Sequence, residues 1–284
     1  DVERSRGLGD VYKRQPYGML ASNVTATSAD IGFTPGDATT WLYEYGPAGF
    51  TPGTGTSATT TNNPFSLSGL VPASDYDVYV QGLCAGNDSS TVSGPYTFST
   101  SCPPFFFAPF AEGFESSGAF PICWTESTQG SAAVVWQAHT GTTTSTATGP
   151  DSASQGDYYM YVETTGSSAG DSVFLMSPTI DVSALINPIL QFDYHMYGAG
   201  MGELHVQMNT GSGWSTIWSK SGDQGNQWFQ DEIVLLAGAS GLPVQLRWVL
   251  VVDDANGFSF ENDVAIDDVP VSYTHLRAHE TSLH

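Results

Sequence analysis

A glycine-rich stretch of the sequence has the composition of a phosphate-binding loop. Residues 191–208 read QFDYHMYGAGMGELHVQM and carry glycines at positions 198, 200 and 202. A glycine loop that cradles phosphate has to open a helix, whose first backbone N–H groups face the anion. No helical pattern follows these glycines, so we expect them to let the backbone turn between two antiparallel strands.

Soft side chains in the same stretch could hold copper. They are His195, Met196, Met201 and His205. In a regular strand His205 shares the outer face with Glu203 and Gln207, whereas we expect His195 to lie on the partner strand among its apolar neighbours. We therefore expect solvated or hydrogen-bonded histidines here and no metal site.

Two catalytic motifs are matched by their letters alone. Residues 166–170 read GSSAG and satisfy G-x-S-x-G, but a nucleophile elbow joins a strand to a helix, and this segment joins two predicted strands. Residues 279–284 read HETSLH, with histidines five apart where a zinc-binding helix needs four. We expect no catalytic residue in either motif.

Carboxylates and tryptophans are the remaining candidates for chemistry on sugars. The acids of one loop are Asp253, Asp254, Glu261 and Asp263, and the tryptophans are Trp214, Trp218 and Trp228. A glycosidase needs two acids that face each other across about 5 to 10 Å, and spacing along a loop does not establish this. Tryptophans in strands more often pack a sandwich core than stack on a sugar. We predict no enzyme activity in this chain.

The elements that must position these residues are strands. Short runs of alternating apolar and polar residues, separated by Gly, Pro, Asp and Ser, predict an all-β protein. No apolar run approaches the roughly 20 residues of a membrane-spanning helix. The 29 acidic and 7 basic residues make a surface that repels nucleic acid and anionic lipid, and that suits divalent cations or a saline exterior.

Both ends of the chain differ in composition from its interior. Five of the seven basic residues lie in the first 15 or last 14 positions, namely Arg4, Arg6, Lys13, Arg14 and Arg277. The segments RGLGDVYKRQ and VSYTHLRAHET resemble translated sequencing-adapter sequence, which is found on unrelated environmental gene fragments. We therefore set residues 1–15 and 272–284 apart as non-native tails and expect the interior to be a fragment of a longer protein.

Residues 16–101 predict an immunoglobulin-like sandwich of about seven short strands. The segment PFSLSGLVPASDYDVYVQGLC alternates as a half-buried strand does after position 74. Its leucines, proline, tyrosine and valines (Leu67, Leu70, Pro72, Tyr76, Val78 and Val80) resemble the signature of a fibronectin type III domain. The resemblance implies that Tyr76 is a corner tyrosine, whose hydroxyl group binds nearby backbone. EYGPAGFTPGTGT also resembles the versions found in large secreted proteins of Bacteroidetes-type bacteria.

Residues 102–110 form a proline-punctuated linker, and residues 111–271 predict a larger jelly roll of two packed sheets. The segments FE (114–115), CW (123–124), FDYHMYGAGMGELHVQM, WSKSGDQGNQWFQDEIVLL and VAIDDVPV resemble a MAM domain. Animal MAM domains carry four cysteines, of which only Cys123 has a clear counterpart here. We expect packing, and a structural calcium ion, to replace the missing bridges.

Acidic residues at both ends of this jelly roll are candidates for that calcium site. Glu112 and Glu115 open the domain and Asp267 and Asp268 end it, and the first and last strands of many jelly rolls are neighbours. Clustered carboxylates repel one another unless they are protonated or bridged by a cation, and calcium accepts six to eight oxygens. We predict calcium ligands at Glu115, Asp268, Asp157 and Asp267; a solvated acidic rim is the alternative.

Three cysteines allow one disulfide bond with one thiol left over. We predict a bond between Cys84 and Cys102, which would close a loop of about 18 residues and stabilise the fold by roughly 3 kcal/mol. The alternative is a bond between Cys102 and Cys123. No Cys/His cluster suggests zinc, so an oxidising exterior is indicated.

These observations predict a non-catalytic adhesion or recognition fragment of a larger secreted or cell-surface protein. Its partner would be a protein or glycan at a cell surface or in the extracellular matrix, and not nucleic acid, and no segment of the chain would span a membrane. The alternatives are an accessory region of a secreted peptidase or glycoside hydrolase, and a carbohydrate-binding module.

Overall fold

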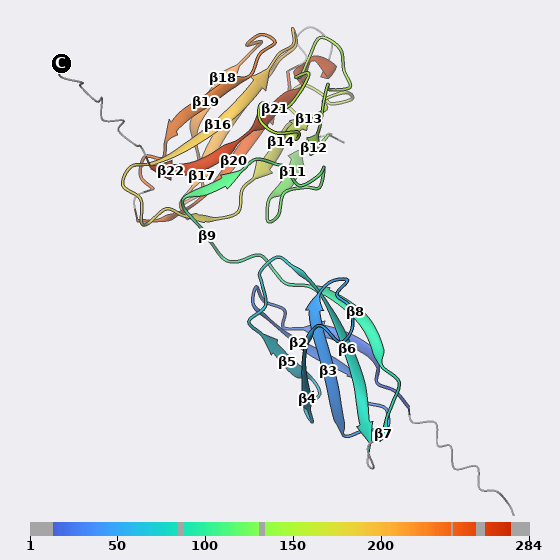
Figure 1. Cartoon of the computed structure of the whole chain (residues 1–284). Coiled ribbons are helices and arrows are strands. Elements are labelled where there is room, and N and C mark those ends of the chain that lie inside the picture. Colours follow the sequence, from blue (N-terminus) through green and yellow to red (C-terminus); the bar gives the residue numbers. More distant parts are fainter. Residues whose placement is uncertain (1–13, 85–87, 131–133, 240, 254–258, 274–284) are drawn as a thin grey trace, which may run out of the picture. The chain divides into compact units, whose positions relative to one another are not determined.

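The chain folds into two compact units, residues 1–104 and 105–284, whose division falls inside the segment predicted as a linker. The structure, a computed structural model, describes residues 14–84, 88–130, 134–239, 241–253 and 259–273 (Figure 1). Residues 279–284, Asp254 and nearly all of both predicted tails therefore lie outside the described residues. Within the described ranges no helix is both long enough and apolar enough to span a membrane.

Unit 1 is an immunoglobulin-like sandwich of two antiparallel sheets, as predicted. One sheet has the order β1–β2–β5, made of Tyr17–Ser22, Ser28–Thr34 and Phe65–Ser68. The other has the order β4–β3–β6–β7, with β8 also paired to β6; these strands are Thr56–Thr60, Thr40–Pro47, Asp75–Cys84, Asp88–Ser89 and Ser93–Ser99. The segment 23–36 holds one strand, β2, and β1 lies before it.

The core of unit 1 follows the alternation predicted for β6. Tyr76, Val78 and Val80 are buried, and the Tyr76 hydroxyl oxygen accepts a hydrogen bond from the backbone N–H of Val71 at 2.9 Å. This is the contact expected of a corner tyrosine. Asp77 is also buried, on the other face of β6, where it accepts hydrogen bonds from the N–H of Gly49 and the hydroxyl of Thr97.

Unit 2 is a jelly-roll sandwich of two larger sheets. The β16 sheet has the order β10–β22–β16–β21–β13–β12, with β19 paired to the other edge of β16; its strands are Phe110–Glu112, Val269–Tyr273, Pro188–Met196, Val264–Asp267, Tyr159–Val162, Trp136–His139 and Phe229–Leu235. The first and last strands of this sheet, β10 and β22, are hydrogen-bonded neighbours, as we expected. β22 ends at Tyr273, so the first two residues of the predicted tail lie within this strand.

The β20 sheet lies in the other layer of unit 2. Its path is β11–β14–β20–β15–β9, and β17 pairs with both β20 and β18; the strands are Thr125–Gln129, Ser172–Met176, Pro243–Val251, Ile180–Asp181, Phe106–Phe107, Glu203–Asn209 and Trp214–Ser221. Between the sheets, Phe192 from β16 and Trp248 from β20 are fully buried. Burying each such side chain contributes roughly 1.5 to 3 kcal/mol, so this layer supplies most of the stability of unit 2.

The glycine-rich segment that follows β16 crosses between the two sheets. We expected β16 and β17 to form a hairpin, but β16 pairs with β19, β21 and β22, whereas β17 pairs with β18 and β20. Gly202 is required at the end of this crossing because a Cβ atom there would lie 2.1 Å from the carbonyl oxygen of Val251. The glycines therefore allow close backbone packing, and no helix follows them.

The corner tyrosine predicts a specific loss of stability. Tyr76→Phe should lower the free energy of unfolding of unit 1 by about 1 to 2 kcal/mol, because the N–H of Val71 loses its partner in a partly buried place. Tyr79→Phe, on the opposite face of the same strand, should change it by less than about 0.5 kcal/mol. Denaturant unfolding of the whole chain measures both, and equal effects of the two substitutions would contradict the prediction.

Candidate functional site

The acidic residues predicted to bind calcium surround one loop of unit 2, residues 151–158. The Glu115 carboxylate accepts hydrogen bonds from the backbone N–H groups of Asp157 and Tyr158, each at 3.0 Å. Gly156 makes this approach possible, since a Cβ atom there would lie 2.2 Å from a Glu115 oxygen. Glu115 therefore holds the loop against the start of unit 2.

Asp267, at the end of β21, holds the same loop from the other side. Its Oδ2 accepts hydrogen bonds from the N–H groups of Ser154 and Gln155, both at 2.9 Å, and its Oδ1 accepts one from the N–H of Asp268. The Asp268 carboxylate accepts a further bond from the side-chain amide of Gln155. Asp268 has a positive φ of 41°, which separates β21 from β22 where we expected one strand.

Asp193 is a fifth member of this network that sequence analysis missed. It is buried on the outer face of β16, where its carboxylate accepts hydrogen bonds from the Ser154 hydroxyl at 2.6 Å and from the N–H of Asp231 at 2.8 Å. The signal available in the sequence was a single acidic residue in a strand whose other residues are apolar, aromatic or uncharged. We interpreted this strand as part of the packed core and did not consider Asp193 as a site residue.

The network bears on the predicted calcium site. The structure brings Glu115, Asp157, Asp267 and Asp268 to one loop, but three of these carboxylates accept hydrogen bonds from N–H groups of that loop. Among the described residues, no three His, Cys, Asp or Glu side chains are arranged to hold a metal ion. The side chains as they lie do not form a calcium ligand set, and calcium stays a prediction.

Burial changes the ionisation of two acids of unit 2. It raises the pKa of Asp267 to about 7 although three N–H groups bind the carboxylate. It also raises the pKa of Asp263 to about 7, an effect to which the charge of Glu163 adds. The Asp263 Oδ1 accepts hydrogen bonds from Thr164, whereas its buried Oδ2 makes none with the described residues. These groups respond to pH without forming a catalytic pair.

The three cysteines pair differently from our first prediction. Cys84 is free, whereas Cys102 and Cys123 are each disulfide-bonded, so the predicted bond between Cys84 and Cys102 is wrong. The reason lies in strand direction. Ser99 pairs with Asp75 at the start of β6, and Cys84 ends that strand nine residues, or about 30 Å, further on. A disulfide bond cannot span such a distance.

The side chains considered for copper lie on different faces of unit 2. Met196 and Met201 are in the core, and His205 is on the outer face of the β20 sheet, 3.0 Å from Glu203. His195 is buried on the outer face of the β16 sheet, where its Nε2 bonds the side-chain oxygen of Asn226 and burial lowers its pKa. The prediction that His205 faces outward with Glu203 and Gln207 is confirmed.

The G-x-S-x-G segment connects β13 to β14, two strands, as predicted. The serine at the nucleophile position of this motif, Ser168, is exposed, and its backbone N–H donates a hydrogen bond to the Asp171 carboxylate at 2.9 Å. The preceding residue, Ser167, is buried and closes the turn by donating its hydroxyl to the carbonyl oxygen of Thr164 at 2.7 Å. Neither the strand-to-helix geometry nor a histidine partner of a nucleophile elbow is present among the described residues.

The three tryptophans have separate roles. Trp218 packs on the core and donates to Glu232, and Trp228 packs on His195 and donates to the carbonyl oxygen of Ser152. Trp214 is half-buried on the outer face of the β20 sheet. A bulge in β18 between the partners of Val206 and Gln207 turns Trp214 and Trp218 to opposite faces, although they are four residues apart.

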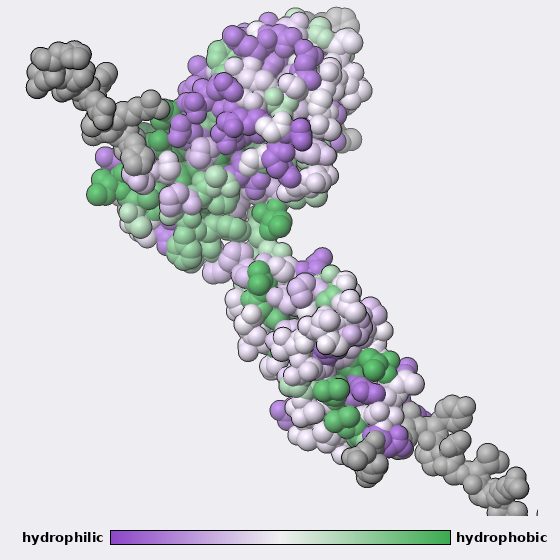
Figure 2. All heavy atoms as spheres, viewed as in Figure 1, coloured by the Kyte–Doolittle hydropathy of each residue, from purple (hydrophilic) through white to green (hydrophobic). Residues whose placement is uncertain are grey.

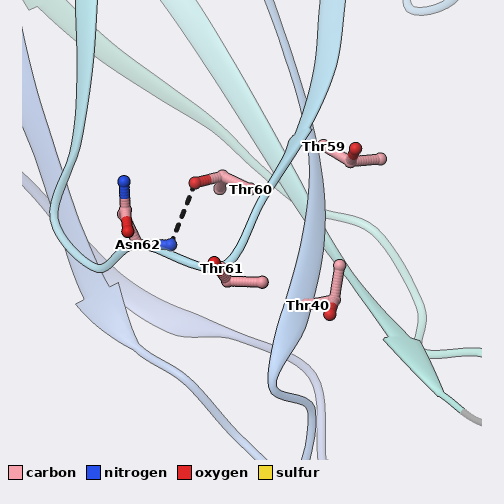
Figure 3. A pocket seen from close by; sticks show the side chains of 5 residues that line it. All are labelled: Thr40, Thr59, Thr60, Thr61 and Asn62. Carbon is pink, nitrogen blue, oxygen red and sulfur yellow. Dashed lines mark hydrogen bonds between the residues drawn. The ribbon is translucent and has the colours of Figure 1, made fainter.

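Two shallow hollows lie on the described surface. The hollow of unit 1, of about 320 Å³, is lined by Thr40, Thr59, Thr60, Thr61 and Asn62, and in it the Asn62 N–H donates to the Thr60 hydroxyl (Figure 3). The hollow of unit 2, of about 240 Å³, is lined by Thr179, Asn209, Thr210, Gly211, Pro243 and Gln245. Both hollows are lined by uncharged residues that include hydroxyl and amide side chains, which suits hydroxyl-bearing ligands more than ions.

Unit 2 also has an apolar surface. Figure 2 shows hydrophobic residues gathered at the end of unit 2 near β22 and hydrophilic ones at the opposite end of that unit. Ile233 and Leu235 are exposed on the edge strand β19, and Ile186, in the loop before β16, is 82% exposed. Contiguous apolar surface of this kind is typical of sites that contact another protein.

Fold and surface together define unit 2 as a jelly-roll module with outward-facing polar and apolar surfaces. Residues 113–275 match the family described as MAM domain, meprin/A5/mu. This match covers more than half of the sequence, and the chain belongs to the MAM domain family.

Curated relatives agree with this family. MAM domain-containing glycosylphosphatidylinositol anchor protein 1 of Gallus gallus is 33% identical over 116 residues, which cover 39% of this chain and 11% of that protein. Thyroid hormone-induced protein B of Xenopus laevis is 30% identical over 140 residues, or 48% of this chain and 19% of that protein. The chain thus spans between a tenth and a fifth of the length of these relatives.

Solved structures are similar at low sequence identity. The K2 cleaved adhesin domain of Lys-gingipain has 15% identity and a TM-score of 0.44, and the match covers 58% of this chain and 98% of that one. The fn3 domain of human collagen alpha-1(XX) has 24% identity and a TM-score of 0.28, and the match covers 32% of this chain and 86% of that one. A carbohydrate-binding module solved with β-1,4-galactotriose has 12% identity and a TM-score of 0.37, and the match covers 56% of this chain and 92% of that one.

The raised pKa values predict how stability depends on pH. Between about pH 4 and pH 7 folded Asp263 and Asp267 keep protons that the unfolded chain has released, so the free energy of unfolding should fall as the pH rises through this interval. Denaturant unfolding at pH 5 and pH 8 measures the change. Asp263→Asn should make the difference between the free energies of unfolding at pH 5 and at pH 8 smaller by roughly 1 to 3 kcal/mol.

Asp157→Asn is the matched control, because it removes the same charge from an exposed position of unit 2. It should leave the pH dependence as it is in the original chain. If both substitutions flatten the dependence equally, the general acidity of the chain causes it and the prediction for Asp263 is wrong.

Proposed function

We propose that the chain is a non-catalytic recognition region of a secreted or cell-surface protein, which binds a glycan or protein ligand through unit 2. Membership of the MAM domain family is the observation that carries this proposal. Curated relatives that are anchor proteins of a membrane surface support the location. Unit 1 would act as a spacer or a second adhesive module.

The internal hydrogen bonds of unit 2 support a binding function over a catalytic one. The Asp267 carboxylate, which could do chemistry, is engaged in holding the loop 151–158. A catalytic group needs to face a substrate with its reactive atom free. The outer faces of the two sheets, by contrast, present half-buried aromatic, apolar and amide side chains.

A carbohydrate-binding module is the second candidate, and the outer face of the β20 sheet favours it. Trp214 lies there half-buried, and the hollow lined by Asn209, Thr210 and Gln245 is on the same face. Aromatic rings beside amide and hydroxyl groups suit the C–H faces and hydroxyl groups of sugars. Within a larger protein such a module would serve a secreted peptidase or glycoside hydrolase as an accessory region.

The proposed function predicts binding without turnover. The whole chain, immobilised through one terminus, should bind saturably to members of a glycan array or of a panel of extracellular proteins. It should hydrolyse neither peptide nor glycoside substrates. Turnover that disappears in Ser168→Ala or Asp263→Asn would contradict the proposal, and so would the absence of saturable binding to every member of both collections.

Calcium at Glu115, Asp157, Asp267 and Asp268 is a separate proposal that concerns stability. Bound calcium should raise the melting temperature of unit 2 above its value in a chelator, because it binds the folded state alone. Glu115→Gln should remove that rise. The hydrogen-bonded loop provides the competing account, in which the melting temperature is the same with calcium and with chelator, and that result would contradict the calcium proposal.

A further inference from the structure

Arg247 is an unusual residue in this acidic chain. It and Lys220 are the only basic residues between Pro16 and Val271, in a sequence with a net charge of −22. Arg247 lies in the middle of β20 and is half-buried, and its neighbours Leu246 and Trp248 are fully buried in the core. Because side chains alternate along a strand, Arg247 points away from the core, onto the outer face of the β20 sheet.

Three side chains of neighbouring strands hold the guanidinium group of Arg247. Its Cζ lies 4.2 Å from the ring centroid of Trp214 and 4.8 Å from that of Phe174. Its Nε donates a hydrogen bond to the side-chain oxygen of Gln207 at 2.7 Å. The cation–π contacts and the hydrogen bond donated by Nε fix the plane of the guanidinium group, and its two terminal nitrogens are left to bind other partners.

The charge of Arg247 has no counter-charge among the described residues. The ion pair found on this face joins His205 to Glu203, and the hydrogen bond to Gln207 is the one that Arg247 makes within the described chain. Two terminal N–H₂ groups in one plane match the two oxygens of a carboxylate. A rigid, unpaired guanidinium on a surface is thus prepared to bind an anion.

The polar hollow of unit 2 continues this face of the sheet. Gln245 is two residues from Arg247 on β20, so the two side chains point the same way, and Gln245 pairs across the sheet with Asn209, which pairs in turn with Trp214. Asn209 and Gln245 line the hollow together with Thr210. Arg247, the edge of Trp214 and the hollow therefore form one surface, which we name the β20 face.

We propose that the β20 face binds an oligosaccharide that carries an isolated carboxylate, such as a uronate-containing glycan. Arg247 would pair with the carboxylate, Trp214 would pack on a sugar ring, and the amides and hydroxyl of the hollow would bind sugar hydroxyl groups. This inference rests on the proposed recognition function and names the ligand class for one of its surfaces.

The charges of the chain distinguish this ligand from other anions. A densely sulfated polymer would meet one guanidinium and, beyond it, the negative field of the whole chain, which repels it. A single carboxylate on an otherwise neutral sugar needs only the one local cation. An acidic peptide would bring several carboxylates, but beyond Arg247 the lining of the hollow offers only uncharged residues, namely threonine, asparagine, glutamine, glycine and proline.

The test compares four probes on the whole chain by isothermal titration calorimetry. They are a trimer of two galactose residues and one galacturonate residue, which we call the galacturonate trimer, the neutral galactose trimer, a densely sulfated oligosaccharide and a glutamate-rich peptide. The galacturonate trimer should bind about tenfold or more tightly than each of the others, which is the order expected for a charge-assisted bidentate contact.

Variants assign the preference to its residue. Arg247→Gln should reduce the affinity for the galacturonate trimer to that for the neutral trimer, and Arg247→Lys, which keeps the charge without the planar fork, should lie between them. Lys220→Gln is the matched control, since it removes the same charge from β18 outside the β20 face, and it should bind within about twofold of the original chain. Melting curves confirm that each variant is folded.

Several outcomes would overturn the inference. They are equal affinity for the acidic and neutral trimers, an undiminished preference in folded Arg247→Gln or Arg247→Lys, an equal loss in Lys220→Gln, tighter binding of the sulfated or peptide probe, or no binding of any probe. The proposed recognition function is contradicted by a different result, namely that the chain binds no member of the glycan array and no member of the protein panel.

Discussion

Alternation along the strands of unit 2 is the constraint on which both its stability and its surfaces depend. On β20 one residue, Trp248, is fully buried between the sheets, and the residue before it, Arg247, is held on the outer face by Trp214 and Phe174. The core fixes the strand in one register, because a shift by one residue would expose the tryptophan and bury the charge. The same packing that stabilises the module therefore decides which side chains it presents.

Carboxylates have a structural role on the other sheet. Glu115 and Asp267 hold the loop 151–158 through its N–H groups, and Asp193 holds it through the Ser154 hydroxyl, so the acidity of this region is built into the fold. Burial then raises the pKa of Asp267, since the solvent that would stabilise its charge is excluded. Residues that suggest catalysis or metal binding in the sequence thus serve to close the outside of a sandwich.

Regular alternation made much of this fold predictable from the sequence. The buried positions of β6 and β17 follow from local patterns. The contact of the corner tyrosine was expected from the resemblance to a fibronectin type III domain, and the pairing of β10 with β22 from the arrangement common to jelly rolls. Irregular features were missed because they leave little trace in the sequence. The strand β11 reads TESTQ and is exposed throughout, and the bulge that separates Trp214 from Trp218 depends on long-range pairing. Strand direction, which excludes the bond from Cys84 to Cys102, is a property of the folded sheet.

The central claim is that recognition belongs to the outer face of the β20 sheet and that the acidic loop belongs to the scaffold. Nuclear magnetic resonance of the whole chain, titrated with a galacturonate trimer, tests this most directly. The account predicts that chemical shifts change at the Arg247 Nε–H and the Trp214 indole N–H, while the amides of residues 151–158 stay unchanged. Changes centred on residues 151–158, with none at Arg247, would contradict it.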